Sequence, residues 1–236
     1  MIIRIRWNFS IVFLAAAVLA GSYQLASTSS LAIRQVPTAE KLVALTYDDG
    51  PQPQTTPQLL RILQQKQVKA TFFVLGVNAA AQPEMVRQAY RDGHEIASHA
   101  YTHRFFNTLS TAEYTAEMDQ ANQLISRLAS QPALFRPPGG AWNDTVARVA
   151  LERGQTTILW SVDSGDWRRP PVSRVVATVL SSVKPGAIVL MHDGQPDLPT
   201  PEATAIVIDK LRESGYRFVT VSELLQHSQS KPPSQP

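Results

Sequence analysis

The 236-residue chain has no cysteine. Disulfide bonds and thiolate metal sites are therefore excluded, and any bound metal has to be held by histidine and carboxylate side chains. Charge is scarce as well: charged residues make up 17% of the chain and the formal net charge is +3, with Arg168 and Arg169 as the longest basic run. A charge this small and scattered argues against nucleic acid as a partner.

Glycine-rich phosphate loops are also missing. No GxGxxG or P-loop pattern follows the first predicted strand, which weighs against the nucleotide-binding α/β folds. Hydrophobic residues, in contrast, make up 44% of the chain. That is enough for a sizeable core, and the length suits a single domain on the scale of an α/β barrel. The same composition argues against global disorder.

The N-terminal residues have the pattern of an export signal. Arg4 and Arg6 precede an apolar run at 11–20, and small residues follow it, which is typical of a secretory signal peptide. The strict run is shorter than the roughly 20 residues of a membrane span, but residues 7–25 together would allow an uncleaved anchor. We therefore expect export, with the protein secreted, periplasmic or tethered to the outer face of the membrane.

The domain boundaries follow from composition. Residues 1–26 are expected to be the signal peptide or N-terminal anchor, and residues 27–40 a linker. Residues 41–226 form the predicted domain. Residues 227–236, rich in Pro, Ser and Gln, are expected to be a disordered tail.

Within the domain, β-rich runs alternate with helical patterns. Ser110 and Glu113 make a capping box that predicts the start of one of these helices. Alternating strands and helices indicate parallel strands with right-handed crossovers, and strands that are apolar on both faces favour a barrel over an open sheet. The sequence therefore predicts a (β/α) barrel with about seven parallel strands, at residues 41–47, 70–75, 95–98, 133–135, 156–162, 187–191 and 217–221.

Unusual polar residues follow the predicted strands. They are Asp48, Asp49, His99, His103, Arg136, Asp163, Asp166, His192 and Asp193. All lie at carboxyl ends of strands, the face on which parallel α/β barrels build their active sites.

Two histidines four residues apart, with a carboxylate from a neighbouring strand, predict a metal site. His99, His103 and an aspartate would make a three-ligand centre with open positions. Taken alone, each pattern has a plain alternative: a pair of surface histidines, or an Asp-Asp-Gly-Pro surface turn. His94 belongs to a helix-to-strand turn and is expected to be structural.

Five segments resemble the conserved motifs of the polysaccharide deacetylase family, the NodB-homology domain of carbohydrate esterase family four. They stand in the family's order and span nearly all of residues 41–223. The segments are 46–50 (TYDDG), 99–103 (HAYTH), 136–140 (RPPGG), 163–167 (DSGDW) and 190–192 (LMH).

The resemblance implies a distorted (β/α) barrel and metal-dependent removal of acetyl groups from glycans. By position, Asp49, His99 and His103 resemble the ligands of one divalent metal. Zinc is the favoured ion, and cobalt, nickel and manganese are alternatives.

The resemblance also implies catalytic roles. Asp48 resembles the catalytic base and His192 the general acid. Arg136 resembles the arginine that tethers the base, and Asp166 the carboxylate that orients the acid.

The substrate side is implied in the same way. The Gly139 N–H occupies the position that binds the oxyanion, and Trp167 and Leu190 resemble walls of the acetyl pocket. Tyr47, at a position where Phe is usual, is counted with the substrate-binding residues. Gly139 stands where an aromatic residue is frequent, which predicts the loss of a side wall, and Ala100 replaces a frequent hydroxyl residue.

The expected partner is an N-acetylated glycan polymer. Peptidoglycan is favoured and chitin-type oligomers come second. The alternatives are an O-acetyl xylan esterase, a deacetylase of a small molecule or protein-linked sugar, and a catalytically silent glycan-binding module.

Overall fold

The computed structural model describes residues 31–228. The predicted signal or anchor and residues 229–236 of the predicted tail lie outside the described residues. No helix in residues 31–228 is both long enough and apolar enough to cross a membrane.

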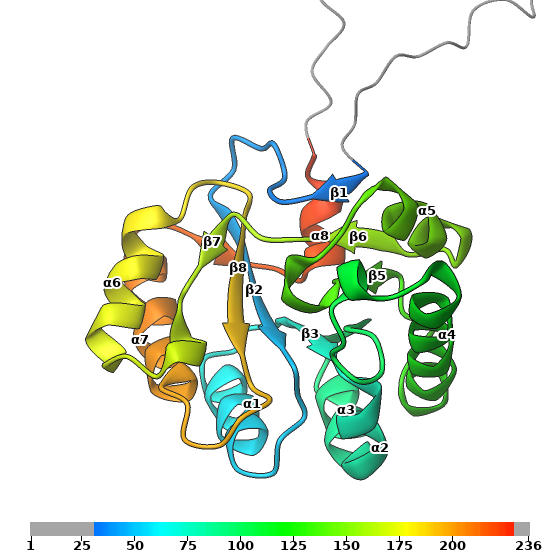
Figure 1. The fold of residues 1–236 in the computed structure, drawn as a ribbon. Helices are drawn as coiled ribbons and strands as arrows, with labels where there is room; N and C mark the ends of the chain where they lie inside the picture. The colour runs from blue at the N-terminus through cyan, green and yellow to red at the C-terminus, as the bar shows by residue number, and fades with distance from the viewer. Residues whose placement is uncertain (1–30, 229–236) are drawn as a thin grey trace, which may run out of the picture. The chain divides into compact units, whose positions relative to one another are not determined.

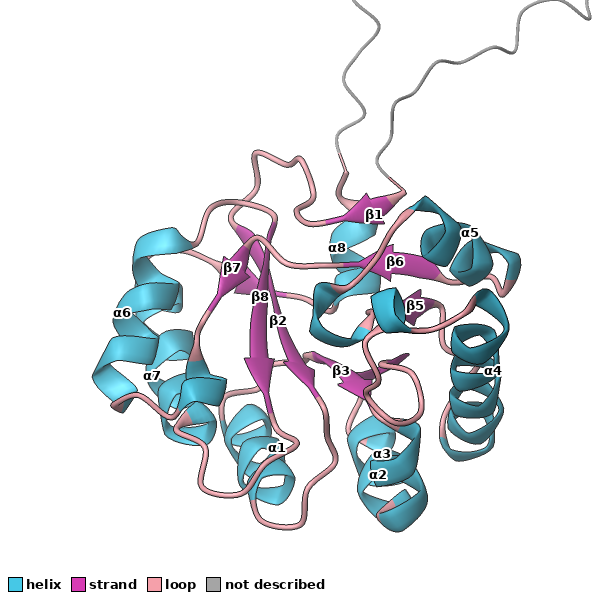
Figure 2. Ribbon diagram, viewed as in Figure 1, coloured by secondary structure: helices cyan, strands magenta, loops and turns pink. Residues whose placement is uncertain are grey.

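The described chain forms one curled sheet with helices packed around it (Figures 1 and 2). The strand order is β1-β6-β5-β4-β3-β2-β8-β7, with β9 paired to the first residues of β2, and all ladders are parallel. The predicted distorted (β/α) barrel is confirmed. The strands are β1 (Ala32–Ile33), β2 (Leu42–Asp48), β3 (Thr71–Val74), β4 (Glu95–Ser98), β5 (Leu134–Phe135), β6 (Thr156–Ile158), β7 (Val162–Asp163), β8 (Ala187–His192) and β9 (Arg217–Phe218).

Helices follow most of the strands and cover the outside of the curl (Figure 2). The capping box of Ser110 and Glu113 is formed at the start of α4, as predicted. The helices are α1 (Thr55–Gln65), α2 (Gly76–Ala81), α3 (Pro83–Arg91), α4 (Thr111–Leu128), α5 (Asp144–Glu152), α6 (Val172–Ser182), α7 (Thr200–Glu213) and α8 (Val221–Gln226).

The core has two main layers because successive strand residues point to opposite faces. Along β2, Leu42 and Ala44 belong to an interior cluster that also takes residues from β3, β4, β5, β6, β8 and α8. Val43, Leu45 and Tyr47 belong to an outer cluster, between the sheet and the surrounding helices. The alternation continues to the end of β2, where Thr46 and Asp48 point inward and both contact Arg136.

The run at 156–162 is two short strands rather than the single strand that was predicted. β6 pairs with β5 and β1, whereas β7 pairs with β8 at the other end of the sheet. The three residues between β6 and β7 therefore carry the chain across the open seam of the barrel. Their backbone is bonded to both sides, since Leu159 N–H donates to Ile33 O (2.7 Å) and Ser161 N–H donates to Ile188 O (3.1 Å).

The seam is closed by residues 31–36, which the sequence analysis places in a linker. β1 extends the sheet beyond β6, and Gln35 then makes an antiparallel bridge to Ala187. Val36 N–H donates to Gly186 O (3.0 Å), and the Val36 side chain is buried in the interior cluster. The folded barrel therefore begins before Lys41, and part of the expected linker stabilises it.

Gly186 gives a test of the seam. It has a φ of 77°, and a Cβ on it would lie 1.8 Å from the Val36 carbonyl oxygen, a backbone atom. Gly186→Ala should lower the free energy of unfolding by about 2–4 kcal/mol, from left-handed strain plus the clash. Gly154→Ala is the matched control: its φ is 70°, no atom lies within 4 Å of its Cβ, and it should cost only about 1 kcal/mol. Urea denaturation measures both. Equal losses would show that the seam contact adds nothing.

Candidate active site

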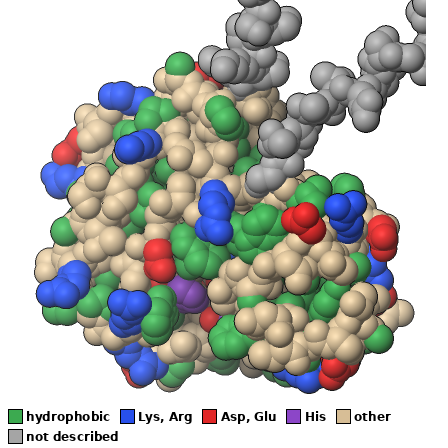
Figure 3. Space-filling model, turned by 45° about the horizontal axis from the view of Figure 1, so that its top comes forward, with side chains coloured by type: hydrophobic (Ala, Val, Ile, Leu, Met, Phe, Trp, Pro, Cys, Tyr) green, Lys and Arg blue, Asp and Glu red, His purple; other side chains and the backbone are tan. Residues whose placement is uncertain are grey.

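A cavity of about 320 Å³ opens at the carboxyl ends of the strands. Histidine and carboxylate atoms are visible in a hollow between apolar side chains (Figure 3). Most of the residues that were predicted for a site from their strand-end positions meet there. The lining comprises Asp48, Asp49, His99, His103, Phe105, Gly139, Trp160, Asp163, Trp167, Leu190, His192 and Gln195.

Asp49, His99 and His103 fit a divalent metal. Asp49 Oδ1 lies 3.4 Å from His99 Nε2 and 3.3 Å from His103 Nε2. Ligand atoms about 2.1 Å from a tetrahedral ion are separated by about 3.4 Å, so this spacing suits a shared ion. Asp49 Oδ1 is also buried without a hydrogen-bond partner in the described chain, which is costly unless a cation compensates it. Donor set, spacing and the orphaned oxygen all agree with a metal site.

The ring of His99 is oriented so that its Nε2 could bind a metal ion. Its Nδ1 donates to the Arg136 carbonyl oxygen (2.7 Å), so the lone pair lies on Nε2, which faces Asp49. Burial lowers the pKa of His99 to about 3, against the opposing charge of Asp49. A neutral imidazole is the form that binds metals.

Backbone conformation places the other two ligands. Asp49 has a φ of 74° and His103 a φ of 61°, a left-handed conformation that costs a non-glycine residue about 1–3 kcal/mol. The loop before His103 is fixed from α4: the Tyr101 and Thr102 N–H groups donate to Glu117 Oε2, at 3.1 and 2.7 Å. Glu117 could not be predicted from the sequence, because it lies on a helix with no motif around it.

Asp48 is paired with a fully buried arginine. Arg136 Nη1 donates to Asp48 Oδ1 (2.6 Å) and to Thr46 Oγ1 (2.8 Å). Its other nitrogens face the carbonyls of Ile158 and Leu159, at 3.4 and 3.1 Å. Burial raises the pKa of Asp48, and Arg136 acts against that rise. Asp48 is thus a basic carboxylate with one oxygen tethered and the other 3.7 Å from His99 Nε2.

His192 is paired with a buried carboxylate. The ring Nδ1 of His192 lies 2.8 Å from Asp166 Oδ1, and the backbone N–H of His192 donates to Asp166 Oδ2 (2.8 Å). Thr200, which the sequence analysis did not consider, donates its hydroxyl to the same Oδ2 (2.5 Å). Burial alone would lower the pKa of His192, but the hydrogen bond and charge of Asp166 outweigh it and raise the pKa to about 9. The ring is therefore a cation at neutral pH, with Nε2 free to donate.

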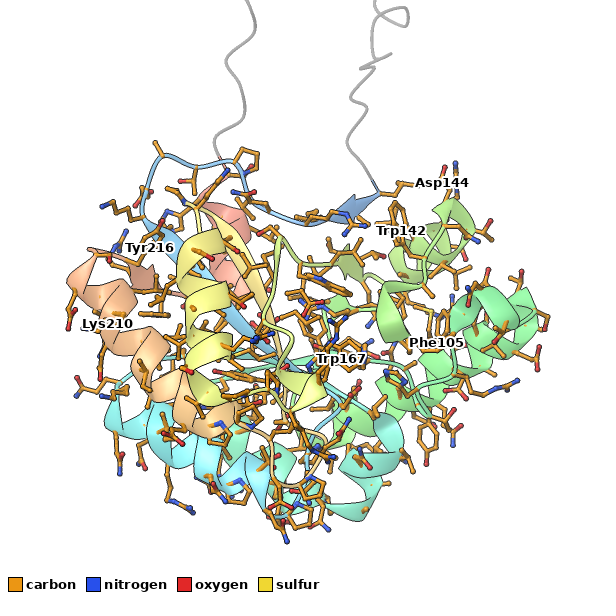
Figure 4. All side chains as sticks on the ribbon, turned by 60° about the vertical axis from the view of Figure 1, so that its left-hand side comes forward. Phe105, Trp142, Asp144, Trp167, Lys210 and Tyr216 are labelled. Atoms are coloured by element: carbon orange, nitrogen blue, oxygen red, sulfur yellow. The ribbon has the colours of Figure 1, made fainter. Side chains whose placement is uncertain are left out.

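The remaining walls are mainly apolar. Leu190, Trp167 and Gly139 line the cavity as the resemblance implied. Gly139 has a φ of 61°, and a Cβ there would lie 2.4 Å from the Phe105 ring. The expected loss of an aromatic side wall is therefore wrong, because Phe105 occupies that space. Phe105, labelled in Figure 4, comes from the loop between β4 and α4. Phe105 is 49% exposed and its ring packs against His103.

The prediction that Tyr47 is a substrate-binding residue is wrong, because Tyr47 does not line the cavity. Its side chain is fully buried in the outer core cluster, where it packs on Phe72 and its hydroxyl lies 3.1 Å from Thr204 Oγ1 on α7. The strand alternation explains the difference: Tyr47 points away from the side of β2 that carries Thr46 and Asp48.

His94 and Asp193 complete the set of buried ionisable groups near the sheet ends. His94 accepts from Ala70 N–H (3.2 Å) and has the structural position that was expected. Asp193 received no role from the sequence, yet its carboxylate is buried beside the loop of Asp49 and Gly50, accepts from Thr56 Oγ1 (2.6 Å), and leaves Oδ1 unpaired among the described residues. Burial raises the pKa of Asp193 to about 7. A Cβ on Gly50 would lie 2.3 Å from that carboxylate, so the two loops pack tightly.

A parallel α/β barrel with a His-His-Asp triad, a tethered carboxylate and a charged histidine in one cavity has the architecture of a metal-assisted hydrolase. Residues 35–158 match the family model for polysaccharide deacetylases. The chain belongs to the polysaccharide deacetylase family, as its motifs predicted.

Curated relatives cover most of the chain. A peptidoglycan-N-acetylglucosamine deacetylase from Bacillus cereus is 41% identical over 196 residues, which is 82% of this chain and 92% of that protein. A chitooligosaccharide deacetylase from a Bradyrhizobium species is 44% identical over 156 residues, or 65% and 71% of the two chains.

Solved structures agree on the fold. A peptidoglycan N-acetylglucosamine deacetylase superposes with a TM-score of 0.80 at 32% identity, covering 85% of this chain and 95% of the other. A pseudoenzyme of the same family from Bacillus anthracis has a TM-score of 0.79 at 32% identity, covering 84% of this chain and 70% of the other.

The pairing of His192 with Asp166 can be tested by titration. Asp166→Asn should lower the pKa of His192 from about 9 toward the ordinary value of about 6.5, because the raising charge is lost while burial remains. NMR of the ring protons measures the shift, with His94 as an internal control. The pair also stabilises the wild-type fold, fully below pH 6.5 and less as the pH rises through about 9. An unchanged His192 pKa in the variant would refute the assignment.

Proposed function

We propose that this protein is a metal-dependent deacetylase that removes N-acetyl groups from N-acetylglucosamine units of a polysaccharide. Peptidoglycan is the favoured polymer and chitin-type oligomers come second. The observation that carries the proposal is the pairing of two oppositely charged groups in one cavity: Asp48 tethered by Arg136, and His192 charged by Asp166. Family membership and the names of the relatives support the same reaction.

Asp49, His99 and His103 would hold one divalent ion. Zinc suits two imidazoles and a carboxylate, and cobalt, nickel and manganese are the alternatives. When bound there, such an ion supplies Lewis acidity that activates water and polarises the acetyl carbonyl.

Asp48 serves as the general base in this proposal. It takes the proton of the attacking water as the new C–O bond forms, and its raised pKa makes it a better acceptor than an ordinary aspartate. Arg136 keeps it ionised and fixes which oxygen faces the cavity.

His192 and Gly139 act on the other end of the amide. The turn bonds around Gly139 run from the N–H groups of Gly140 and Ala141. In this proposal the Gly139 N–H donates to the acetyl oxygen as negative charge develops there. One such donor is worth about 3 kcal/mol in other enzymes. His192 gives its Nε2 proton to the sugar nitrogen as the C–N bond breaks, which releases acetate and a free amine.

Two of the alternative functions differ in the use that they would make of the same residues. The catalytic pair could equally cleave an O-acetyl ester, so an acetylxylan esterase shares this mechanism. Loss of catalysis on this fold has a precedent in the pseudoenzyme of similar structure, but a silent glycan-binding module has no need of an intact base and acid. The contacts of Asp48 and His192 therefore favour an enzyme.

We also propose that the protein is exported. The support is the basic and apolar pattern of residues 1–26, and a cell-wall polymer is a substrate met outside the cytoplasm.

Acetate release tests the proposed reaction directly. The wild-type protein should release acetate from peptidoglycan and from chitotetraose, lose this activity with a chelator, and regain it when zinc is added back. Acetylxylan is included in the same assay. Release from acetylxylan alone would favour the esterase, and no release from any substrate would favour the silent module.

Two variants separate chemistry from metal binding. Asp48→Asn should reduce turnover by a factor of about 10²–10⁴ and still bind one metal ion, because Asp48 is the base and not a ligand. His99→Ala should lose the ion itself. Metal content measured by mass spectrometry and acetate release together decide the roles, with circular dichroism to confirm folding. Wild-type turnover in Asp48→Asn would remove the base assignment.

A further inference from the structure

A second cavity of about 460 Å³ adjoins the active site. It shares Asp163 with the catalytic cavity and continues from there toward the start of α6. Arg168 and Arg174 line it, together with Ser164, Gly165, Pro170 and Thr178. We call this cavity the arginine pocket. None of the roles proposed above uses it.

The arginine pocket carries positive charge that no carboxylate of residues 31–228 neutralises by an ion pair. Neither Arg168 nor Arg174 is in an ion pair, and both are exposed. Asp163, at the catalytic end, accepts a hydrogen bond from Gly165 N–H (2.9 Å). The pocket therefore has one negative group where it meets the active site and two free cations beyond it.

Arg174 is not placed there by the needs of its helix. Arg174 stands in the first turn of α6, where a positive side chain opposes the helix dipole and an acidic one would be favourable. Arg168 lies over the Trp167 ring, 4.5 Å from its centre, and Trp167 is a wall of the catalytic cavity. A cation is thus stacked on a residue that also lines the catalytic cavity.

We infer that the arginine pocket binds a carboxylate carried by the sugar next to the reacting N-acetylglucosamine. This inference rests on the proposed function and names its substrate more closely. In peptidoglycan every second sugar carries a lactyl ether, whose carboxylate is free or extended by a peptide that has carboxylates of its own. Chitin has no such group. Two arginines in a cavity suit a carboxylate, which guanidinium groups bind in a planar, bidentate manner.

The inference also explains how one of two similar sugars is selected. Both sugars of peptidoglycan carry an N-acetyl group, so the acetyl pocket alone cannot choose between them. A carboxylate held at Arg168 and Arg174, and repelled from the catalytic end by Asp163, sets the register of the polymer. The sugar without the acidic substituent then lies in the active site.

The test is the double variant Arg168→Gln/Arg174→Gln in the full-length protein. Arg127→Gln is the matched control, since Arg127 is an exposed arginine of α4, across the barrel from α6 (Figure 1). Acetate release is followed on three substrates: peptidoglycan strands with their peptides, strands stripped to the bare lactyl carboxylate by an amidase, and neutral chitotetraose.

The double variant should raise KM for the carboxylate-bearing strands by about tenfold, with kcat little changed, as expected when rim charges that guide binding are lost. The KM for chitotetraose should stay within about twofold, and the control should match the wild type throughout. A loss only on the stripped strands assigns the pocket to the lactyl carboxylate, and a loss only on peptide-bearing strands assigns it to the peptide carboxylates. A loss on both kinds of strand shows that the pocket binds either carboxylate.

An equal change in KM for chitotetraose, or no change for either strand, would overturn the inference. Failure of the proposed function looks different, because the wild-type protein would then be inactive on all three substrates. In that case calorimetric binding of the strands to the wild type and the double variant still decides the question: weaker binding by the variant supports the arginine pocket, and equal binding refutes it.

Discussion

Arg136 lies inside the barrel, out of contact with solvent, and every polar group around it is arranged to satisfy it. Two of its nitrogens face backbone carbonyls at the seam, one bonds Thr46 and Asp48, and its guanidinium lies over the Phe73 ring. A buried ion pair of this kind gives little net stability, but removal of one partner leaves an uncompensated charge that costs about 3–5 kcal/mol. The Arg136 carbonyl also fixes His99. The seam, the proposed base and a candidate metal ligand therefore all depend on one residue, through its side chain and its backbone carbonyl.

The sequence predicted most of this architecture because the responsible signals are local. Strand-end placement brought Asp48, His99 and His192 to one face, since parallel strands all end on the same edge. Tyr47 was assigned wrongly because a motif names neighbours without saying which face of the strand each one takes. The alternation of Leu42, Ala44 and Thr46 with Val43 and Leu45 would have placed Tyr47 outside.

What the sequence could not predict depends on contacts between distant segments. Glu117 reaches the loop before His103 from α4, and Phe105 fills the space over Gly139. Neither shows a pattern of its own, because each acts through a partner far along the chain. The seam is similar: one apolar run at 156–162 becomes two strands only because the curl of the sheet brings Ile33 and Ile188 to either side of it.

The proposed reaction requires two groups of the cavity to be in opposite protonation states, and buried neighbours favour both states. Asp48 has to be a carboxylate although burial raises its pKa, and His192 has to be a cation although burial lowers its pKa. In each case a fully buried group of opposite charge opposes the pKa shift that burial causes: Arg136 for Asp48, and Asp166 for His192. Because both correcting groups are shielded from water, their charges act at low effective dielectric and are little screened by salt. The apolar core around the strand ends thus serves the proposed chemistry. In a more hydrated site burial would shift the two pKa values less, but the charges of Arg136 and Asp166 would also act less strongly on Asp48 and His192.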